Sequence, residues 1–214
     1  MAEDMAEDMA EKQRSSGIVA IILAAGRGVR FDGGNKLLAP YAGGTVLSTV
    51  ITAVLASHVQ EAVLVTSNAE ILSKIEPRNR LRQVCPDNAH LGISQSLKAG
   101  LSALPANTTG AMIVLGDMPL VTTELIGALA AHFTANGGTK IVYPEDAKGQ
   151  QGHPVIWPRS FFPELLRLSG DSGAKSLITA NAHRTAALAV KTPGAFIDVD
   201  TRADYERILT NRDW

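Results

Sequence analysis

The stretch Ile18–Leu38, IVAIILAAGRGVRFDGGNKLL, decides the fold class of this chain. Its first part is an unbroken apolar run, which is typical of a strand buried on both faces of a parallel sheet. The run gives way to a loop with four glycines and three cations, Arg27, Arg30 and Lys36. Backbone amides in a glycine-rich turn bind anions, and cationic side chains strengthen that binding. The stretch therefore predicts a phosphate-binding loop at the end of a buried strand.

The rest of the chain alternates short apolar segments with segments of helical periodicity. Further strands are expected within 61–67, 82–85, 111–119, 139–144, 153–158 and 185–190. Helices are expected at 46–55, 93–104, from about 122, and at 161–168, 174–181 and 201–209. This alternation predicts an α/β fold, a Rossmann-like three-layer sandwich with a mostly parallel sheet. Ligands of such sheets bind at the carboxyl ends of the strands.

Length and composition limit the domain organisation and the class of partner. Residues 17–214 are long enough for a single α/β domain. Residues 1–16, which contain a tandem MAED repeat, read as an acidic disordered extension. The formal net charge of −1 provides no basic excess for coating nucleic acid. No apolar run approaches the roughly 20 residues that span a bilayer. A lone Cys85 and no visible signal peptide favour the cytoplasm.

The glycine loop does not match the two commonest phosphate-binding motifs. The chain has no GxxxxGK[ST] sequence, and Phe31 stands where a dinucleotide fingerprint would place its third glycine. For glycine-rich loops in general, a plain solvent-exposed connection is the competing interpretation.

Acidic residues occupy two places that suit a metal ion. Asp117 follows the apolar segment AMIVLG, and Mg²⁺ on phosphates takes one or two carboxylates plus phosphate and water oxygens. Asp198 and Asp200 are spaced to point the same way on an extended segment. The competing interpretations are a turn aspartate before a proline for Asp117 and a helix cap for Asp200.

The sequence resembles a known family through motifs that occur in a fixed order. LAAGRGVRF and NKLL in the opening stretch are similar to the signature of the nucleotidyltransferase superfamily. The ordered set as a whole resembles the molybdenum cofactor cytidylyltransferase branch. The later motifs are GISQSLKAGL (92–101), LGDMPLV (115–121), GQQGHPV (149–155), GDSGAK (170–175) and DVDTRADY (198–205).

The resemblance implies a nucleotide-diphospho-sugar-transferase type of fold and a transfer reaction. An acceptor phosphate would attack the α-phosphorus of a nucleoside triphosphate, with pyrophosphate leaving and Mg²⁺ as cofactor. Arg30, Lys36 and Asp117 would carry the catalysis, and Asp117 with Asp198 or Asp200 would hold the metal. The implied nucleotide-binding residues are Leu23, Ala24, Ala25, Gly26, Arg27, Gly28, Lys36 and Ser96. The implied acceptor-binding residues are Gly152, His153, Asp171 and Lys175.

The resemblance also suggests both substrates. Relatives that use pyrimidine nucleotides tend to read LAAG, as here with Ala25, so CTP is expected. The acceptor would be molybdenum-molybdopterin, and a recipient molybdoenzyme is a further expected partner. The alternatives are a guanylyltransferase, a transferase for another phosphate such as a sugar or lactate phosphate, and a non-catalytic pterin-cofactor chaperone. Packing alone is the competing interpretation for Ser96, and an oriented loop residue is the one for His153.

Overall fold

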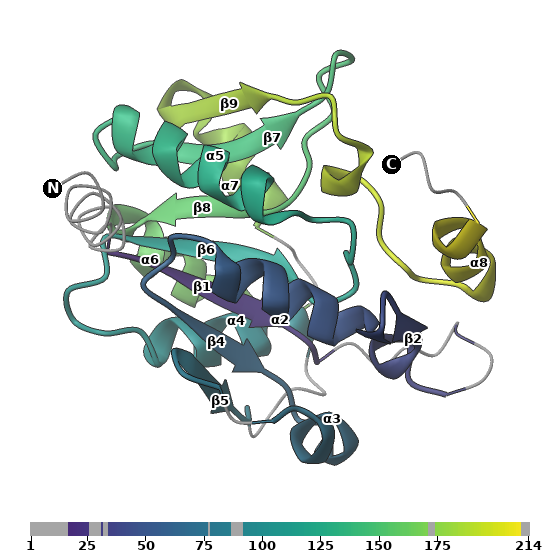
Figure 1. Cartoon of the computed structure of the whole chain (residues 1–214). Coiled ribbons are helices and arrows are strands. Elements are labelled where there is room, and N and C mark those ends of the chain that lie inside the picture. The colour runs from purple at the N-terminus through teal and green to yellow at the C-terminus, as the bar shows by residue number, and fades with distance from the viewer. Residues whose placement is uncertain are drawn as a thin grey trace, which may run out of the picture.

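The computed structural model describes residues 17–25, 31, 34–76, 78–86, 92–170 and 174–210. Within these residues the chain builds one seven-stranded sheet, in the order β5-β4-β1-β6-β8-β7-β9 (Figure 1). All neighbouring strands are parallel except β8, which runs antiparallel to both β6 and β7. The strands are β1 (Ile18–Leu23), β4 (Glu61–Val65), β5 (Leu81–Val84), β6 (Gly110–Leu115), β7 (Ile141–Glu145), β8 (Val155–Pro158) and β9 (Thr185–Ala189).

Helices cover both faces of the sheet, which gives the three layers. Helices α2 (Val46–Ala56) and α5 (Thr123–Ala135) lie on one face and contribute to one buried cluster. Helices α4 (Ile93–Ser102), α6 (Phe162–Arg167) and α7 (Lys175–Ala180) lie on the other face and contribute to a second cluster. The predicted α/β sandwich with a mostly parallel sheet is confirmed.

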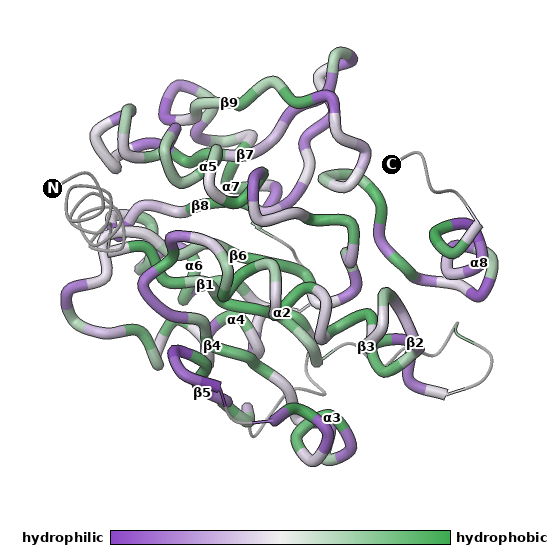
Figure 2. The backbone as a smooth tube through the Cα atoms, viewed as in Figure 1, coloured by the Kyte–Doolittle hydropathy of each residue, from purple (hydrophilic) through white to green (hydrophobic). Residues whose placement is uncertain are grey.

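The central strand β1 shows why the apolar run folds as it does. Ile18, Ala20 and Ile22 point into the first cluster, while Val19 and Ile21 point into the second. A strand with a covered sheet on both faces needs apolar residues at every position. Figure 2 shows the same hydrophobic colour along β1, β4 and β6.

Smaller elements complete the described fold around the sheet. The connection after β1 contains the short 3₁₀ helix η1 and a two-stranded hairpin, and α8 packs against this region through an edge-to-face contact between Phe31 and Tyr205. No helix in the described ranges is long and apolar enough to cross a bilayer. These elements are η1 (Lys36–Leu38), β2 (Pro40–Tyr41), β3 (Gly44–Thr45), α3 (Ala69–Lys74), η3 (Arg159–Phe161), η4 (Ala182–Arg184), η5 (Pro193–Ala195) and α8 (Arg202–Thr210).

The sequence did not predict helix α3, the β2–β3 hairpin or the direction of β8. Helix α3 has only six residues and is capped by Asn68, whose side chain accepts hydrogen bonds from the backbone amides of Glu70 and Ile71. The β2–β3 hairpin has two residues in each strand, too few for a periodic signal. Apolar periodicity also carries no information about strand direction, so the antiparallel β8 could not be read from it.

Candidate active site

The carboxyl ends of β1 and β6 meet where the glycine loop begins. The two strands pair in parallel from Ile18 to Leu23, and the amide of Gly116 donates to the carbonyl of Leu23 at 3.0 Å. The next carbonyl, that of Ala24, accepts a 2.9 Å hydrogen bond from the fully buried Thr66 hydroxyl. These contacts fix the backbone at Leu23 and Ala24 and hold it against Gly116, the residue before Asp117.

Lys36 lies between two carboxylates at this position. Its Nζ atom donates to Oδ2 of Asp117 at 2.6 Å and to Oδ1 of Asp200 at 2.7 Å. The Lys36 side chain is 8% exposed, compared with 20% for Asp117 and 45% for Asp200. The side chain of Asn35, just before η1, accepts a hydrogen bond from the amide of Leu37 and starts the turn that carries Lys36. Three predicted site residues thus form one ionic cluster around a buried lysine.

The cluster shifts the pKa of Lys36 and that of the neighbouring Asp198. Burial lowers the pKa of Lys36, but the charge of Asp117 and the hydrogen bonds to Asp117 and Asp200 outweigh burial and hold that pKa above its usual value. Partial burial raises the pKa of Asp198, and the negative charges of Asp200 and Asp117 raise it further. The lysine therefore stays protonated, and the two carboxylates that it contacts are its counter-ions.

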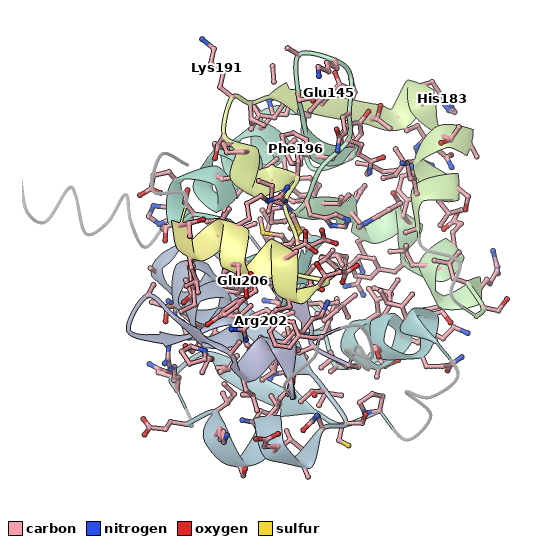
Figure 3. All side chains as sticks on the ribbon, turned by 90° about the vertical axis from the view of Figure 1, so that its right-hand side faces the viewer. Glu145, His183, Lys191, Phe196, Arg202 and Glu206 are labelled. Carbon is pink, nitrogen blue, oxygen red and sulfur yellow. The ribbon has the colours of Figure 1, made fainter. Side chains whose placement is uncertain are left out.

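A backbone contact brings the late acidic segment to Asp117. The amide of Val199, which lies between the two late aspartates, donates to the carbonyl of Asp117 at 2.9 Å. Upstream, Gly194 packs so closely on the chain that a Cβ atom there would lie 2.1 Å from the carbonyl oxygen of Leu120. Figure 3 looks onto this edge of the sheet, with α8 in front and Phe196 above it. The arrangement places Asp200, and not Asp198, against Lys36.

The donor set suits a divalent cation bound together with phosphates. No group of three or more His, Cys, Asp or Glu side chains that could hold a metal occurs among the described residues. Two carboxylates, Asp117 and Asp200, nevertheless already share one cationic atom, Nζ of Lys36. Mg²⁺ usually takes only one or two carboxylates and completes its shell with water and phosphate oxygens. The pair therefore fits a metal that arrives with a nucleotide.

A cavity of about 270 Å³ opens beside the ionic cluster. Its walls are mostly apolar and come from the ends of β1 and β6, from α4, from β8 and from α7. Four polar side chains also line it: Ser94, Gln151, His153 and Lys175. Ligand sites in proteins are commonly apolar clefts with a few polar groups that set orientation. Two predicted acceptor-binding residues, His153 and Lys175, thus meet at one cavity.

Two polar atoms at this cavity have no partner in the described structure. The hydroxyl of Ser94 and Nδ1 of His153 are both buried and unpaired. Burial lowers the pKa of His153, against the opposing effects of the Asp117 charge and of a hydrogen bond to the backbone of Ile113. A neutral imidazole that donates to a backbone carbonyl through one nitrogen keeps the other as an acceptor. Buried polar atoms are normally hydrogen-bonded, so these two are suited to a ligand.

The remaining predicted site residues occupy different settings. Leu23 lines the cavity, whereas Ala24 and Ala25 start the loop next to it. Ser96 is 2% exposed with an unpaired hydroxyl, and it does not line the cavity. Gly152 packs against the chain, because a Cβ there would lie 2.4 Å from the carbonyl oxygen of Ala195. Predicted site residues that lie outside the described residues are Gly26, Arg27, Gly28, Arg30 and Asp171.

Sequence reasoning missed Ser94 and Gln151 at the cavity and Thr66 at the loop. Ser94 lies within the quoted GISQSL motif, and both Ser94 and Ser96 are buried with unpaired hydroxyls, but only Ser94 lines the cavity. Ile93, the first residue of α4, also lines the cavity and is 42% exposed. The sequence carries no signal for Thr66, since its role rests on one long-range hydrogen bond.

Comparison with known proteins shows a sequence similarity that spans most of the described sheet. The family described as "MobA-like NTP transferase domain" matches residues 20–186. A "Probable molybdenum cofactor guanylyltransferase" from Thermococcus gammatolerans is 34% identical over 128 residues, and the match spans 58% of this chain and 61% of that relative, less than two thirds of its length. The "Nicotine blue oxidoreductase" of Paenarthrobacter nicotinovorans is 26% identical over 198 residues, which cover 90% of this chain and 96% of that protein.

A solved structure extends the similarity to three dimensions. Rv0371C of Mycobacterium tuberculosis H37Rv, crystallised as a complex with manganese, is 28% identical, with a TM-score of 0.72, over 90% of this chain and 97% of that one. The predicted nucleotide-diphospho-sugar-transferase type of fold is confirmed. Since the family match covers most of the described sheet and includes Lys36 and Asp117, this chain belongs to the MobA-like NTP transferase family and is a nucleotidyltransferase.

Proposed function

We propose that this enzyme transfers CMP from CTP to the terminal phosphate of a molybdopterin-type cofactor and releases pyrophosphate, with Mg²⁺ as the metal. The observation that carries the proposal is the contact of Lys36 with both Asp117 and Asp200 at the end of β1 and β6. This cluster combines a cation for phosphate with two carboxylates for a metal. The adjoining cavity supplies room for an organic acceptor.

Asp117 and Asp200 would hold the metal, and Lys36 would turn to the triphosphate. A bound Mg²⁺ neutralises charge on the transferring phosphoryl group and aligns its oxygens. Lys36 then donates to phosphate oxygens as a point charge, and Arg30 would add the planar fork that suits phosphate. The acceptor phosphate is already an anion, so the transfer depends on positioning and charge neutralisation and needs no strong base. Asp198 would stay outside this set, because Asp200 is the late aspartate that contacts Lys36.

The acceptor would lie in the cavity lined by His153, Lys175 and Ser94. An organic group there could donate a hydrogen bond to Nδ1 of His153 and exchange one with the Ser94 hydroxyl, which would satisfy both unpaired atoms. Its phosphate would extend past Leu23 toward Asp117. Gly152 and Asp171 would border the acceptor. On the nucleotide side, Ala24 to Gly28 would approach the triphosphate and the base, and Ser96 would lie near the ribose.

The choice of CTP rests on the methyl group of Ala25, which narrows the space beside the loop for a base. GTP is the alternative, because the Thermococcus gammatolerans relative is named a guanylyltransferase. A reaction in the cytoplasm, followed by transfer of the product to a recipient molybdoenzyme, completes the proposal.

The test supplies the enzyme with Mg²⁺, molybdenum-loaded molybdopterin and each of CTP, GTP, UTP and ATP in separate reactions. We expect pyrophosphate release with CTP and a product with the mass of a molybdopterin cytosine dinucleotide. Turnover with GTP alone would make it a guanylyltransferase. Since one relative is named an oxidoreductase, a parallel assay follows NADPH oxidation, which we expect to stay at background.

A single variant distinguishes the enzyme from a pterin-cofactor chaperone. Asp117→Ala should abolish transfer while the protein still binds the pterin cofactor. Unchanged delivery of cofactor, with no transfer by the unmodified enzyme under any condition, would support the chaperone instead.

A further inference from the structure

A second cavity, of about 280 Å³, adjoins the first one. The two share Gln151, Lys175 and Ile178 in their walls. The second cavity lies over β7 and β9, where Tyr143 and Glu145 line it. Strand alternation places Tyr143 and Glu145 on the same face of β7. The shared residues make the two cavities one continuous depression across the sheet.

The depression runs in a defined direction. Leu23 of β1 and Leu115 of β6 line its first part, Trp157 of β8 follows, and Glu145 of β7 lies in its last part. Neighbouring strands are about 4.7–4.9 Å apart, so the step from β6 across β8 to β7 spans about 10 Å. A molecule whose phosphate lies near Asp117 must be elongated to reach Glu145.

The second cavity is polar and held in place by its own contacts. Gln151 forms an antiparallel bridge with Glu145, and the amide of Gly152 donates to the carbonyl of Pro144 at 2.8 Å. Within the intervening turn, Oδ1 of Asp146 accepts hydrogen bonds from the backbone amides of residues 148 and 150 at 2.8 and 2.7 Å. The wall that carries Glu145 is therefore formed before any ligand arrives. Figure 3 shows Glu145 at this edge of the sheet.

The second cavity is lined by two charged side chains, Glu145 and Lys175, that form no ion pair with another described residue. A carboxylate accepts two parallel N–H donors well, and an ammonium group donates to carbonyl or phosphate oxygens. Together they match a planar ring with two adjacent N–H donors on one edge and an oxygen acceptor nearby.

We infer that the second cavity binds the 2-amino-4-oxo-pyrimidine ring of the acceptor, with Glu145 accepting from the 2-amino and N3 hydrogens and Lys175 donating to the 4-oxo oxygen. Tyr143 provides an aromatic side chain beside the ring. The inference rests on the proposed function, because it assigns the far end of the proposed acceptor. It makes Glu145 a specificity-determining residue that lies well away from the reacting phosphate.

The test compares two ring systems by calorimetry. The probes are 6-hydroxymethylpterin monophosphate and its lumazine counterpart, in which the 2-amino group is replaced by an oxygen. The wild-type enzyme should bind the pterin compound about tenfold more tightly, as expected when a charged acceptor loses its donor. Glu145→Gln should remove most of this preference. The matched control Glu76→Gln, at an exposed position, should keep it.

A second pair of variants tests the cation. Lys175→Gln should weaken both probes by about tenfold, whereas Lys191→Gln, an exposed lysine labelled in Figure 3, should leave both unchanged. Circular dichroism of each variant checks that it is folded. The affinities of the wild-type enzyme for the two rings test the inference even if a variant fails to fold.

The results separate this inference from the proposed function. Equal affinities of the wild-type enzyme for the two rings, no binding of either ring, or a preference that survives Glu145→Gln would each overturn the inference. Nucleotidyl transfer to molybdopterin in such a case would still support the proposed function. Conversely, a Glu145-dependent preference without transfer from any nucleotide would support the inference and overturn the proposed function.

Discussion

The ionic cluster of Lys36, Asp117 and Asp200 and the cavity beside it lie at the same edge of the sheet. They differ in whether their polar side chains have hydrogen-bond partners. In the cluster, the lysine contacts both carboxylates at 2.6 and 2.7 Å. At the cavity, Ser94 and His153 keep buried polar atoms without partners among the described residues. In the cluster the lysine and both carboxylates are paired without a ligand, whereas in the cavity two buried polar atoms have no hydrogen-bond partner among the described residues.

The difference teaches how each region must respond to its ligand. On the proposed function, a nucleotide with its metal would have to compete with contacts that already exist, so its binding would rearrange Lys36. An organic acceptor would instead supply contacts that are missing, and an unpaired buried polar group costs about 1–3 kcal/mol. Variants of the cluster should therefore affect catalysis strongly, and variants of the cavity should affect stability and binding in opposite directions.

The largest effect is expected from the carboxylates of the cluster. Asp117→Asn should lower kcat by at least about 100-fold, the scale seen when a group that stabilises transition-state charge is removed. Asp200→Asn should show a comparable loss, since its carboxylate shares Lys36 with Asp117. Pyrophosphate release under saturating CTP and Mg²⁺ measures both variants. Asp198→Asn is the matched control, and a loss as large as that of Asp200→Asn would reassign the metal ligand.

Lys36→Met should separate the two roles of the lysine. Without the ammonium group, Asp117 and Asp200 are released from their counter-ion, so Mn²⁺ alone should bind about tenfold more tightly. Nucleotidyl transfer should fall at the same time, because the triphosphate loses a cation. Calorimetry with Mn²⁺ in the absence of nucleotide measures the first effect, with the exposed Lys74→Met as control. An unchanged affinity would mean that lysine and metal do not compete.

His153 should make stability depend on pH. Burial holds its pKa below 6.5, so the folded protein keeps it neutral while the unfolded chain takes up a proton. The free energy of unfolding is therefore highest above pH 6.5 and falls as the pH drops through that value, by at most about 1.4 kcal/mol per pH unit. Urea unfolding between pH 5 and 8 should show a shallower fall for His153→Gln than for the wild-type protein. The exposed control His58→Gln should follow the wild-type curve, and identical curves for all three proteins would contradict the expectation.

The smallest effect is expected at Ser94, where the sign of the change in the free energy of unfolding is what tests the expectation. Ser94→Ala removes a buried hydroxyl that has no partner among the described residues, so it should raise the free energy of unfolding by about 1 kcal/mol. The same change should weaken binding of the acceptor. Urea unfolding measures the first effect, with Ser102→Ala on the exposed part of α4 as control. A loss of stability in Ser94→Ala would show that the hydroxyl has a partner in solution.

The sequence predicted the sheet well because its central strands are apolar at nearly every position. β1 and β6 are buried along almost their whole length, and an apolar run without alternation is the pattern that a strand covered on both faces requires. The direction of β8 could not be predicted in this way. A short apolar run has the same sequence pattern whether the strand is parallel or antiparallel to its neighbours. The direction of β8 is known only from its pairing with β6 and β7.

The sequence also placed Lys36 and Asp117 at strand ends, but it could not choose between Asp198 and Asp200. Residues two apart on an extended segment point the same way, so spacing alone leaves both open. The structure shows only that Asp200 is the one paired with Lys36, through a contact between side chains 164 residues apart, and its choice as metal ligand belongs to the proposed function. The unpaired atoms of Ser94 and His153 were likewise beyond prediction, because lack of a partner is a property of the packed structure.

The hydrogen bond from Val199 to Asp117 also determines when the ionic cluster can form as the chain folds. The matched family region ends at residue 186, before the segment that supplies Asp200. A chain that ends there could form most of the sheet and would still lack Asp200, one of the two carboxylates that contact Lys36. On the proposed function, termination between residues 190 and 199 would yield an inactive polypeptide in which Lys36 lacks Asp200, and activity would be gained only after the segment that carries Asp200 has folded against Asp117.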